Sequence, residues 1–217
     1  MLMLAVGRKL LCHHESLRQG EWSKNTFLNS SYSLNNKVVG IIGAGNIGRQ
    51  VARRVQAFGA KTQYYDEFKL TPAVETEFSL PYVTFEELIK TSDIITLHIP
   101  LTDQTKHIIG AKELERMKPG AIVINTARGG LVDDCALAAA VRDGRLRGAG
   151  LDGVEREPLS PDDELLQDPN IIVTPHVGGG TADIGDVILP MLAQDIQDFA
   201  DGNDVKHVVN REYLSGK

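Results

Sequence analysis

Residues 37–55 read KVVGIIGAGNIGRQVARRV, and they are the strongest indication of the fold class. Its first part, Val38–Ile42, is a short apolar run, as expected for a strand that is covered on both faces. Its second part places Ile47, Val51 and Val55 on one helical stripe, with basic and polar residues on the other sides. A strand is therefore expected to pass directly into an amphipathic helix through a turn rich in glycine.

That turn, Gly43-Ala44-Gly45-Asn46-Ile47-Gly48, has the spacing G-x-G-x-x-G. Alone the motif is a weak signal, but between a strand and a helix it is typical of a dinucleotide site. Gly43 would make the tight turn, Gly45 would let a pyrophosphate approach the backbone, and Gly48 would let the helix pack closely on the strand. The start of the helix would supply unpaired N–H groups and the positive end of its dipole.

Asp66 stands at the end of the second apparent strand, 18 residues after Gly48. A carboxylate at this place can accept hydrogen bonds from both hydroxyls of an adenosine ribose and would repel a 2′-phosphate. Glu67 adds to that repulsion, so the pair favours NAD over NADP. The alternative is that Asp66 only begins a turn. The strand, the glycines and the spacing together favour the cofactor interpretation.

Beyond this unit, short β-rich runs alternate with helical stretches, which predicts βαβ units and a parallel sheet in an α/β fold. The expected strands are Val38–Ile42, Thr62–Tyr65, Ile94–His98, Ala121–Asn125, Ala149–Leu151 and Ile171–Val173.

The expected helices have recognisable starts and stops. Leu2–Leu11 is predicted to be one helix, and Gly59 to end the helix that begins after Gly45. Thr84 with Glu87 forms a capping-box pattern. Another helix follows Asp133-Asp134 and ends at Gly144, and a last one covers residues 183–200, where Pro190 should kink or split it.

Composition limits the function classes. The chain has 217 residues, 42% of them hydrophobic, which allows one generous domain or a domain plus a fragment. The net charge of −6 argues against nucleic acid or an anionic membrane surface as a partner. Cys12 and Cys135 match no metal or redox spacing, so we expect no metal site and two free thiols in a reducing compartment. The opening residues are too short to span a membrane and lack the flanks of a signal peptide, which favours a cytoplasmic protein.

Chemically useful side chains follow the ends of three expected strands: Arg128, Glu157 and His176. In doubly wound sheets, ligands gather at these carboxyl ends. A guanidinium can bind a substrate carboxylate, and an imidazolium can protonate a developing alkoxide. A carboxylate beside the imidazole favours its charged form and orients the ring. Taken singly, each has an ordinary explanation, a surface ion pair or a turn, but together beside a dinucleotide turn they favour catalysis.

Five ordered blocks of sequence together resemble the D-2-hydroxyacid dehydrogenases: residues 43–48 with Asp66, residues 97–102, 125–133, 150–158 and 174–179. The resemblance covers essentially the whole chain. It implies a Rossmann-type doubly wound parallel sheet and an NAD-dependent enzyme that interconverts a small D-2-hydroxy acid and its 2-keto acid. It also implies that Arg128 binds substrate, that His176 is the general acid and base, and that Glu157 is its partner.

The resemblance also implies the cofactor contacts, with Asp152 near the nicotinamide amide. They would be Gly43, Gly45, Asn46, Ile47, Gly48, Asp66, His98, Pro100, Thr105, Thr126, Ala127, Arg128, Asp152, His176, Gly178 and Gly179. For His98 a strand-capping role is an equal alternative. Four other histidines fall outside the blocks and receive no role: His13, His14, His107 and His207.

Three residues depart from the family pattern. Gly153 and Val154 stand where larger residues are usual, and Pro190 interrupts a helix that is usually continuous, so we expect local packing effects. The Glu157–His176 pairing argues against a formate dehydrogenase, which resembles this family but has Gln in place of the Glu.

Family members begin with a flavodoxin-like substrate domain, and the chain resembles only the part of those proteins that comes after it. We therefore expect residues 1–36 to be a remnant of the interdomain helix and linker, residues 37–182 to be the NAD-binding domain, and residues 183–217 to return to the missing domain. Without that domain's N–H groups and closure, the chain should bind NAD(H) but turn over poorly.

The resemblance further implies a homodimer paired through the nucleotide-binding domain. Two other functions stay open: an NAD(H)-sensing binding protein like the corepressors that resemble this family, and an inactive remnant.

Overall fold

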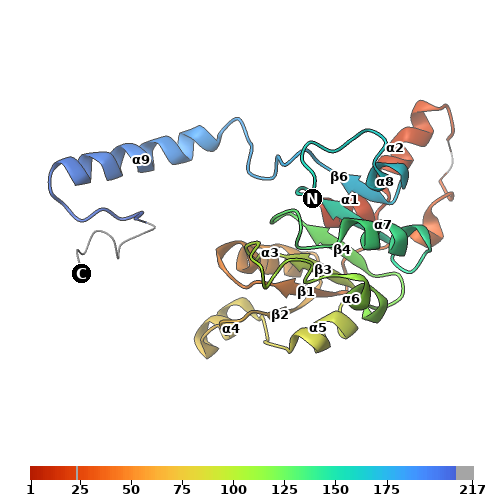
Figure 1. Ribbon diagram of the computed structural model, residues 1–217, viewed down its shortest axis with the longest axis horizontal. Helices are drawn as coiled ribbons and strands as arrows, with labels where there is room; N and C mark the ends of the chain where they lie inside the picture. Colours follow the sequence, from red (N-terminus) through yellow and green to blue (C-terminus); the bar gives the residue numbers. More distant parts are fainter. Residues whose placement is uncertain (23, 209–217) are drawn as a thin grey trace. The chain divides into compact units, whose positions relative to one another are not determined.

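The computed structural model describes residues 1–22 and 24–208. The chain divides into two compact units, one from Met1 to His176 and one that begins at Val177. The first unit is an α/β layered structure (Figure 1). The three-part division predicted from the sequence stays a prediction.

The first unit is built on one sheet of six strands, all parallel and in the order β2-β1-β3-β4-β5-β6. This confirms the predicted doubly wound parallel sheet, and each strand bound lies within one residue of the expected one. The strand order reverses between β1 and β3, and such a switch point opens a crevice at the carboxyl ends of the strands. The strands are β1 Val38–Ile42, β2 Lys61–Tyr65, β3 Ile94–Leu97, β4 Ile122–Asn125, β5 Gly148–Leu151 and β6 Ile171–Val173.

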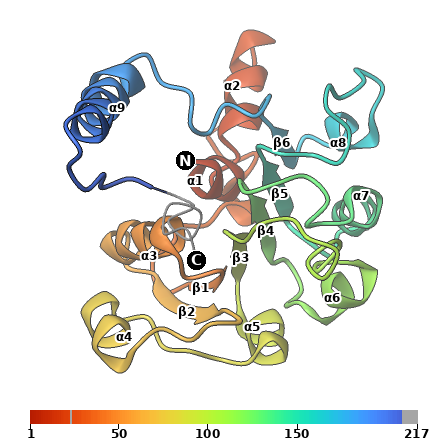
Figure 2. The same ribbon diagram turned by 60° about the vertical axis from the view of Figure 1, so that its left-hand side comes forward.

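Helices cover both faces of the sheet (Figure 2). Successive strand residues alternate between the two core clusters: Ile41 faces one and Ile42 the other, as do Ile94 and Ile95. This explains why the inner strands are largely apolar, whereas the edge strand β2 is not. One face carries α1 Leu2–Gly7, α3 Asn46–Ala57 and α4 Pro72–Phe78; the other carries α5 Phe85–Thr91, α6 Ala111–Arg116, α7 Asp134–Arg142 and α8 Glu164–Gln167.

Local sequence signals set several helix ends. The Thr84 hydroxyl accepts the Glu87 N–H at 3.2 Å at the start of α5, and the Asp133 carboxylate accepts the Ala136 N–H at 2.9 Å at the start of α7. The predicted starts of these helices are therefore confirmed, because each cap satisfies an N–H group that has no partner within its helix.

The prediction of one helix over Leu2–Leu11 is wrong. The chain forms α1 and then α2 Leu10–Arg18, with Lys9 between them in the left-handed conformation (φ 52°). The Lys9 ammonium donates to the Arg147 carbonyl at 3.1 Å and to Asn170 Oδ1 at 2.5 Å. These bonds to the residues just before β5 and β6 hold the break. A short 3₁₀ turn, η1 Leu28–Ser30, follows before β1.

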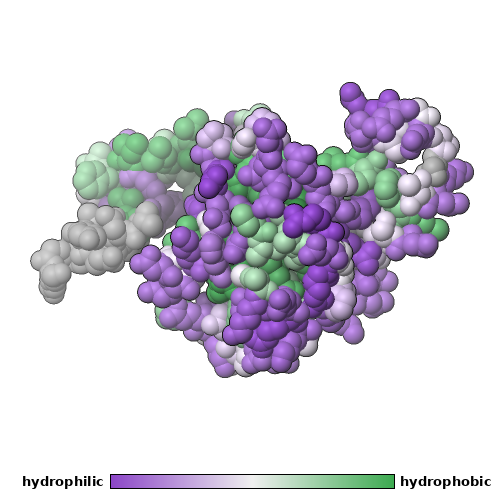
Figure 3. All heavy atoms as spheres, turned by 45° about the vertical axis from the view of Figure 1, so that its right-hand side comes forward, coloured by the Kyte–Doolittle hydropathy of each residue, from purple (hydrophilic) through white to green (hydrophobic). Residues whose placement is uncertain are grey.

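The second unit contains α9 Ile184–Ala200, which continues through Pro190 and so is not split there. Apolar residues are visible at the surface of the molecule in Figure 3. Many apolar side chains of α9 are exposed: Ile184, Val187, Ile188, Leu189, Met191, Leu192, Ile196 and Phe199. Among the described residues, no helix combines the length and apolar character needed to cross a membrane.

Candidate active site

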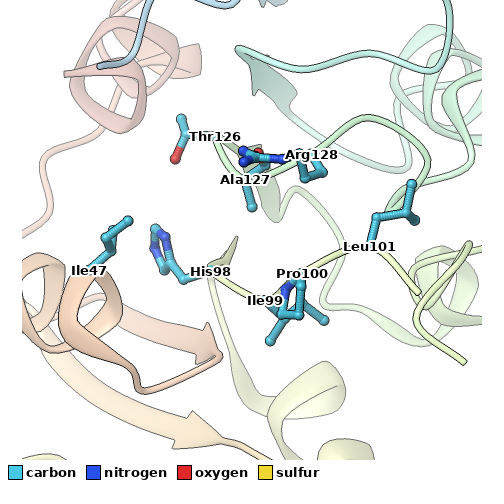
Figure 4. Close-up of a pocket in the computed structure, with 8 residues that line it drawn as sticks. All are labelled: Ile47, His98, Ile99, Pro100, Leu101, Thr126, Ala127 and Arg128. Carbon is cyan, nitrogen blue, oxygen red and sulfur yellow. The ribbon is translucent and has the colours of Figure 1, made fainter. Parts of the chain in front are cut away.

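A cavity of about 340 Å³ lies where the strand order reverses. It receives residues from the start of α3 and from the loops that follow β3 and β4, and Figure 4 shows the Ile47, His98 and Arg128 side chains around it. Six of the predicted cofactor contacts therefore meet at one place. The lining residues are Ile47, His98, Ile99, Pro100, Leu101, Thr126, Ala127 and Arg128.

The glycine turn passes from β1 into α3 beside this cavity. Gly43 has φ +94°, and a Cβ there would lie 2.6 Å from the His98 carbonyl oxygen. A Cβ on Gly48 would collide with the Gly43 carbonyl, so both glycines are required by the fold itself. A Cβ on Gly45 would meet no protein atom within 4 Å. The open space above Gly45 fits a turn that a pyrophosphate approaches.

Asp66 contacts the glycine turn directly. One carboxylate oxygen accepts the Ala44 N–H at 2.8 Å and the other accepts the Phe68 N–H at 3.0 Å. Each oxygen keeps further lone-pair capacity, which ribose hydroxyls could use. Asn46 is also engaged within the turn, since its side-chain oxygen accepts a hydrogen bond from Arg49 at 2.8 Å.

The His98 imidazole lines the cavity and is uncharged at neutral pH. Burial lowers the pKa of its imidazole to about 4. Its Nε2 lies 3.1 Å from the hydroxyl of Thr96, which is itself buried in β3. The structure therefore places His98 at the predicted site and also bonds it back to its own strand.

The loop after β4 that bears Arg128 is fixed by a residue outside the predicted site set, Asn125. Its side-chain amide donates to the Arg128 carbonyl at 2.8 Å, and its side-chain oxygen accepts the Ala127 N–H at 3.1 Å. Asn125 is 1% exposed. The Arg128 side chain is exposed and lines the cavity, with one guanidinium N–H bonded to the Ala127 carbonyl.

Glu157 and His176 form a pair after the neighbouring strands β5 and β6. His176 Nδ1 lies 3.1 Å from both carboxylate oxygens of Glu157, and both side chains are nearly half exposed. The backbone of His176 has φ +53°, a conformation that costs about 1–3 kcal/mol for a residue with a side chain. Its N–H donates to the Thr174 carbonyl at 2.8 Å. The position of the imidazole is thus held by its loop and by Glu157.

This pair borders a second cavity of about 470 Å³ with a largely apolar lining, which also receives Asp152. Asp152 is 5% exposed and accepts the Thr174 hydroxyl at 2.5 Å. The cavity is lined by Asp152, Val154, Glu157, Pro158, Leu159, Leu166, Val173, Thr174, Pro175 and His176.

The loops that carry Arg128 and Glu157 pack against each other. A Cβ on Gly129 would collide with the Val154 carbonyl, and a Cβ on Gly153 would lie 2.9 Å from the Gly129 nitrogen. The small residue at position 153 therefore permits a close backbone contact, and Val154 is buried in the core. Arg128 lines one cavity while Glu157 and His176 line the other, and all three follow adjacent strands at the carboxyl edge of the sheet.

Of the other predicted cofactor contacts, Thr105 lines neither cavity. The Thr105 hydroxyl accepts the Thr102 N–H at 2.7 Å and donates to the Pro100 carbonyl at 2.8 Å, so it shapes the loop that presents Pro100. Gly178 and Gly179 belong to the second unit, and their contact with a cofactor stays a prediction.

His107, which received no role from the sequence, lies close to this edge. Its Nε2 is 2.6 Å from a carboxylate oxygen of Glu155, in the loop that bears Glu157. No local pattern could have revealed the pair, since the two residues are 48 positions apart. Among the described residues, no group of three or more His, Cys, Asp or Glu side chains could hold a metal ion.

Comparison with known proteins agrees with this geometry. A family model described as D-isomer specific 2-hydroxyacid dehydrogenase, NAD binding domain, matches residues 1–178. The chain belongs to this family. A glyoxylate reductase from Thermococcus litoralis is 40% identical over 219 residues, which cover 99% of this chain and 66% of that protein. A hydroxypyruvate reductase from Thermotoga maritima is 44% identical over 186 residues, 84% of this chain and 58% of that protein.

Among solved structures of the family, the D-lactate dehydrogenase with NAD+ from Lactobacillus jensenii aligns with a TM-score of 0.84 at 34% identity. The alignment covers 96% of this chain and 66% of that one. The family match thus identifies an NAD-binding domain in this chain, as the glycine turn predicted. This dehydrogenase-family chain spans about two thirds of the length of the glyoxylate reductase.

Proposed function

We propose that this chain is the NAD-binding and catalytic part of an oxidoreductase that interconverts a small D-2-hydroxy acid and its 2-keto acid. The observation that carries the proposal is the Glu157–His176 pair at 3.1 Å, at the same sheet edge as the glycine turn. An acid–base pair beside a dinucleotide site is the minimum that this chemistry requires. The family and its relatives support the same reaction class.

In this proposal each of three side chains has one task. Arg128 holds the carboxylate of the acid with its planar fork of N–H donors. His176 gives a proton to the carbonyl oxygen of the keto acid, or takes one from the hydroxyl of the hydroxy acid. Glu157 accepts the Nδ1–H of His176, which leaves Nε2 to exchange the proton with the substrate. NAD(H), when bound, accepts or supplies the hydride.

The residues present fit NAD on two structural observations. The space beside the Cα of Gly45 is open, whereas protein atoms occupy the space beside the Cα atoms of Gly43 and Gly48. The Asp66 carboxylate lies beside the same turn, where it could accept hydrogen bonds from ribose hydroxyls and would repel a 2′-phosphate. Gly43, Gly45, Gly48 and Asp66 would hold the adenosine and pyrophosphate, and Asp152 would lie near the nicotinamide amide.

Two measurements on the chain as it stands test the proposal. Fluorescence titration should show NADH binding, and absorbance at the NADH band should fall when glyoxylate, hydroxypyruvate, pyruvate or 4-methyl-2-oxopentanoate is added. We expect slow turnover. His176→Asn should lower the rate by about 10²–10⁴-fold, the usual contribution of a general acid, with NADH affinity kept.

Glu115→Gln, at an exposed position of α6, serves as the matched control and should leave both measurements unchanged. A rate that His176→Asn does not alter would contradict the assigned acid. NADH binding without oxidation by any keto acid would contradict the proposed activity of this chain and favour a binding protein.

The proposal also extends to the setting of the enzyme. We propose a cytoplasmic homodimer that pairs through the nucleotide-binding domain, acts on small molecules and does not bind nucleic acid. The division into residues 1–36, 37–182 and 183–217 is proposed with it. Light scattering coupled to size exclusion tests the dimer, and a monomeric mass would contradict it.

A further inference from the structure

The loop that carries Glu157 is fixed from outside the two cavities, at Glu155. The backbone N–H of Glu155 donates to Asp134 Oδ2 at 2.7 Å. Asp134 is the first residue of α7, which packs in the core beneath this edge. Glu155 is two residues from Glu157, so this bond limits the positions that the Glu157 backbone can take.

The side chain of Glu155 makes a second connection. Its carboxylate lies 2.6 Å from His107 Nε2, and each side chain is 36% exposed. The backbone N–H of His107 donates to the Gly130 carbonyl at 2.8 Å, two residues after Arg128. His107 therefore contacts the Arg128 loop with its backbone and the Glu157 loop with its ring.

The backbone of His107 is itself in an unusual conformation, with φ +51°. Such a conformation persists where the surroundings over-determine it. They do so here, because the next residues pair with the chain beyond Gly130: the Ile109 N–H donates to the Leu131 carbonyl at 3.2 Å, and the Asp133 N–H to the Ile109 carbonyl at 3.0 Å. His107, in the left-handed conformation, comes just before these paired residues, and the His107 ring is bonded to Glu155.

The charged groups near Asp134 and Glu155 are mainly acidic. Burial raises the pKa of Asp134 to about 6, with smaller contributions from the charges of Glu155, Asp163 and Asp133, while the Glu155 N–H opposes the rise. The imidazole of His107 lies next to the Glu155 carboxylate in these acidic surroundings. The hydrogen bonds of Asp134 and His107 hold Glu155 in place.

We propose that Glu155, held by Asp134 and His107, is a positioning residue that fixes Glu157 against His176 and sets the distance between the Glu157 and Arg128 loops. We call Glu155, with Asp134 and His107, the anchor. The inference rests on the proposed function, because it gives the anchor the task of positioning the acid–base pair of that reaction. A contact between Glu155 and His107 with no such role would add only a little local stability and would leave the Glu157–His176 pair unchanged.

The ring tautomer of His176 shows whether the anchor keeps Glu157 in place, and measuring it does not require turnover. In the anchored state Nδ1 carries a proton and donates to Glu157. Long-range ¹H–¹⁵N spectra of the labelled chain above the titration range of the imidazole show which nitrogen is protonated. We expect Glu155→Ala to raise the population of the Nε2–H tautomer at least about threefold, because a loosened Glu157 no longer selects Nδ1–H.

Paired variants separate positioning from a general loss of structure. Asp134→Asn keeps an acceptor for the Glu155 N–H and should retain the wild-type tautomer, whereas Asp134→Ala should behave like Glu155→Ala. His107→Asn tolerates the positive φ but is too short to reach Glu155, so it should give an intermediate shift. Glu115→Gln is the control again, and thermal melts confirm that each variant is folded.

Where turnover is measurable, the anchor variants should lower kcat about tenfold with the NADH dissociation constant unchanged. A His176 tautomer that is the same in Glu155→Ala, Asp134→Ala and wild type, in folded protein, would overturn the inference. Failure of the wild-type chain to bind NADH would instead count against the proposed function and leave the tautomer result intact.

Discussion

The glycines of the turn after β1 meet different demands, although the sequence spaces them as one motif. Replacing Gly48 by Ala would bring a Cβ against the Gly43 carbonyl, so we expect a loss of at least about 2 kcal/mol in the free energy of unfolding. A Cβ on Gly45 would meet no protein atom within 4 Å, so replacing Gly45 by Val should cost less stability than Gly48→Ala, yet weaken NADH binding about tenfold or more.

Urea denaturation and NADH titration of both variants measure the two effects. Equal NADH affinity in Gly45→Val and wild type would show that no pyrophosphate approaches the turn there.

Burial of His98 makes the stability of the fold depend on pH. Its pKa is about 4 in the folded chain and near 6.5 when exposed, so the unfolded chain binds the proton more tightly. The stabilisation is fully present above pH 6.5 and is lost as the pH falls toward 4. Between pH 7 and pH 5, His98→Asn should therefore lose about 1–2 kcal/mol less stability than the wild type.

Denaturant titrations at the two pH values measure this difference, and His14→Asn, at an exposed position of α2, is the matched control. Parallel losses in wild type and His98→Asn would show that the imidazole is hydrated in the folded chain.

At the scale of elements, the inner strands were predictable because they are buried on both faces and so are largely apolar. The starts of α5 and α7 were predictable because Thr84 and Asp133 act on N–H groups within the same turn. The break between α1 and α2 was not predictable, because the two residues that bond to Lys9 lie 138 and 161 positions further along the chain.

Lys9→Met tests that break. The variant keeps the aliphatic stem but leaves the Arg147 carbonyl and the Asn170 side chain without the ammonium donor, which should cost about 1–3 kcal/mol of stability. Lys112→Met, on the exposed side of α6, should cost less than about 0.5 kcal/mol. Equal melting temperatures for the two variants would mean that the Lys9 hydrogen bonds do not hold the joint.

At the scale of the whole molecule, cofactor binding should stabilise the first unit. A ligand present at 100 times its dissociation constant adds about 2.7 kcal/mol to the free energy of unfolding. NADH should therefore raise the melting temperature clearly, and NADPH at the same concentration should raise it less, because Asp66 and Glu67 oppose a 2′-phosphate. Differential scanning fluorimetry with both cofactors decides the point, and equal shifts would contradict the assigned role of Asp66.

Patterns along the chain predict the α/β class, the six strands, the glycine turn and the side chains that come after β4, β5 and β6. These features are local: periodicity, turn chemistry and capping act over a few residues, and parallel strands bring their carboxyl ends to one edge. Tertiary structure decided the rest. Only packing across the sheet shows that Asn125 fixes the Arg128 loop, that Lys9 breaks a helix, and that His107 meets Glu155. Each of these depends on groups brought together by the completed fold, and spacing along the chain carries no record of such contacts.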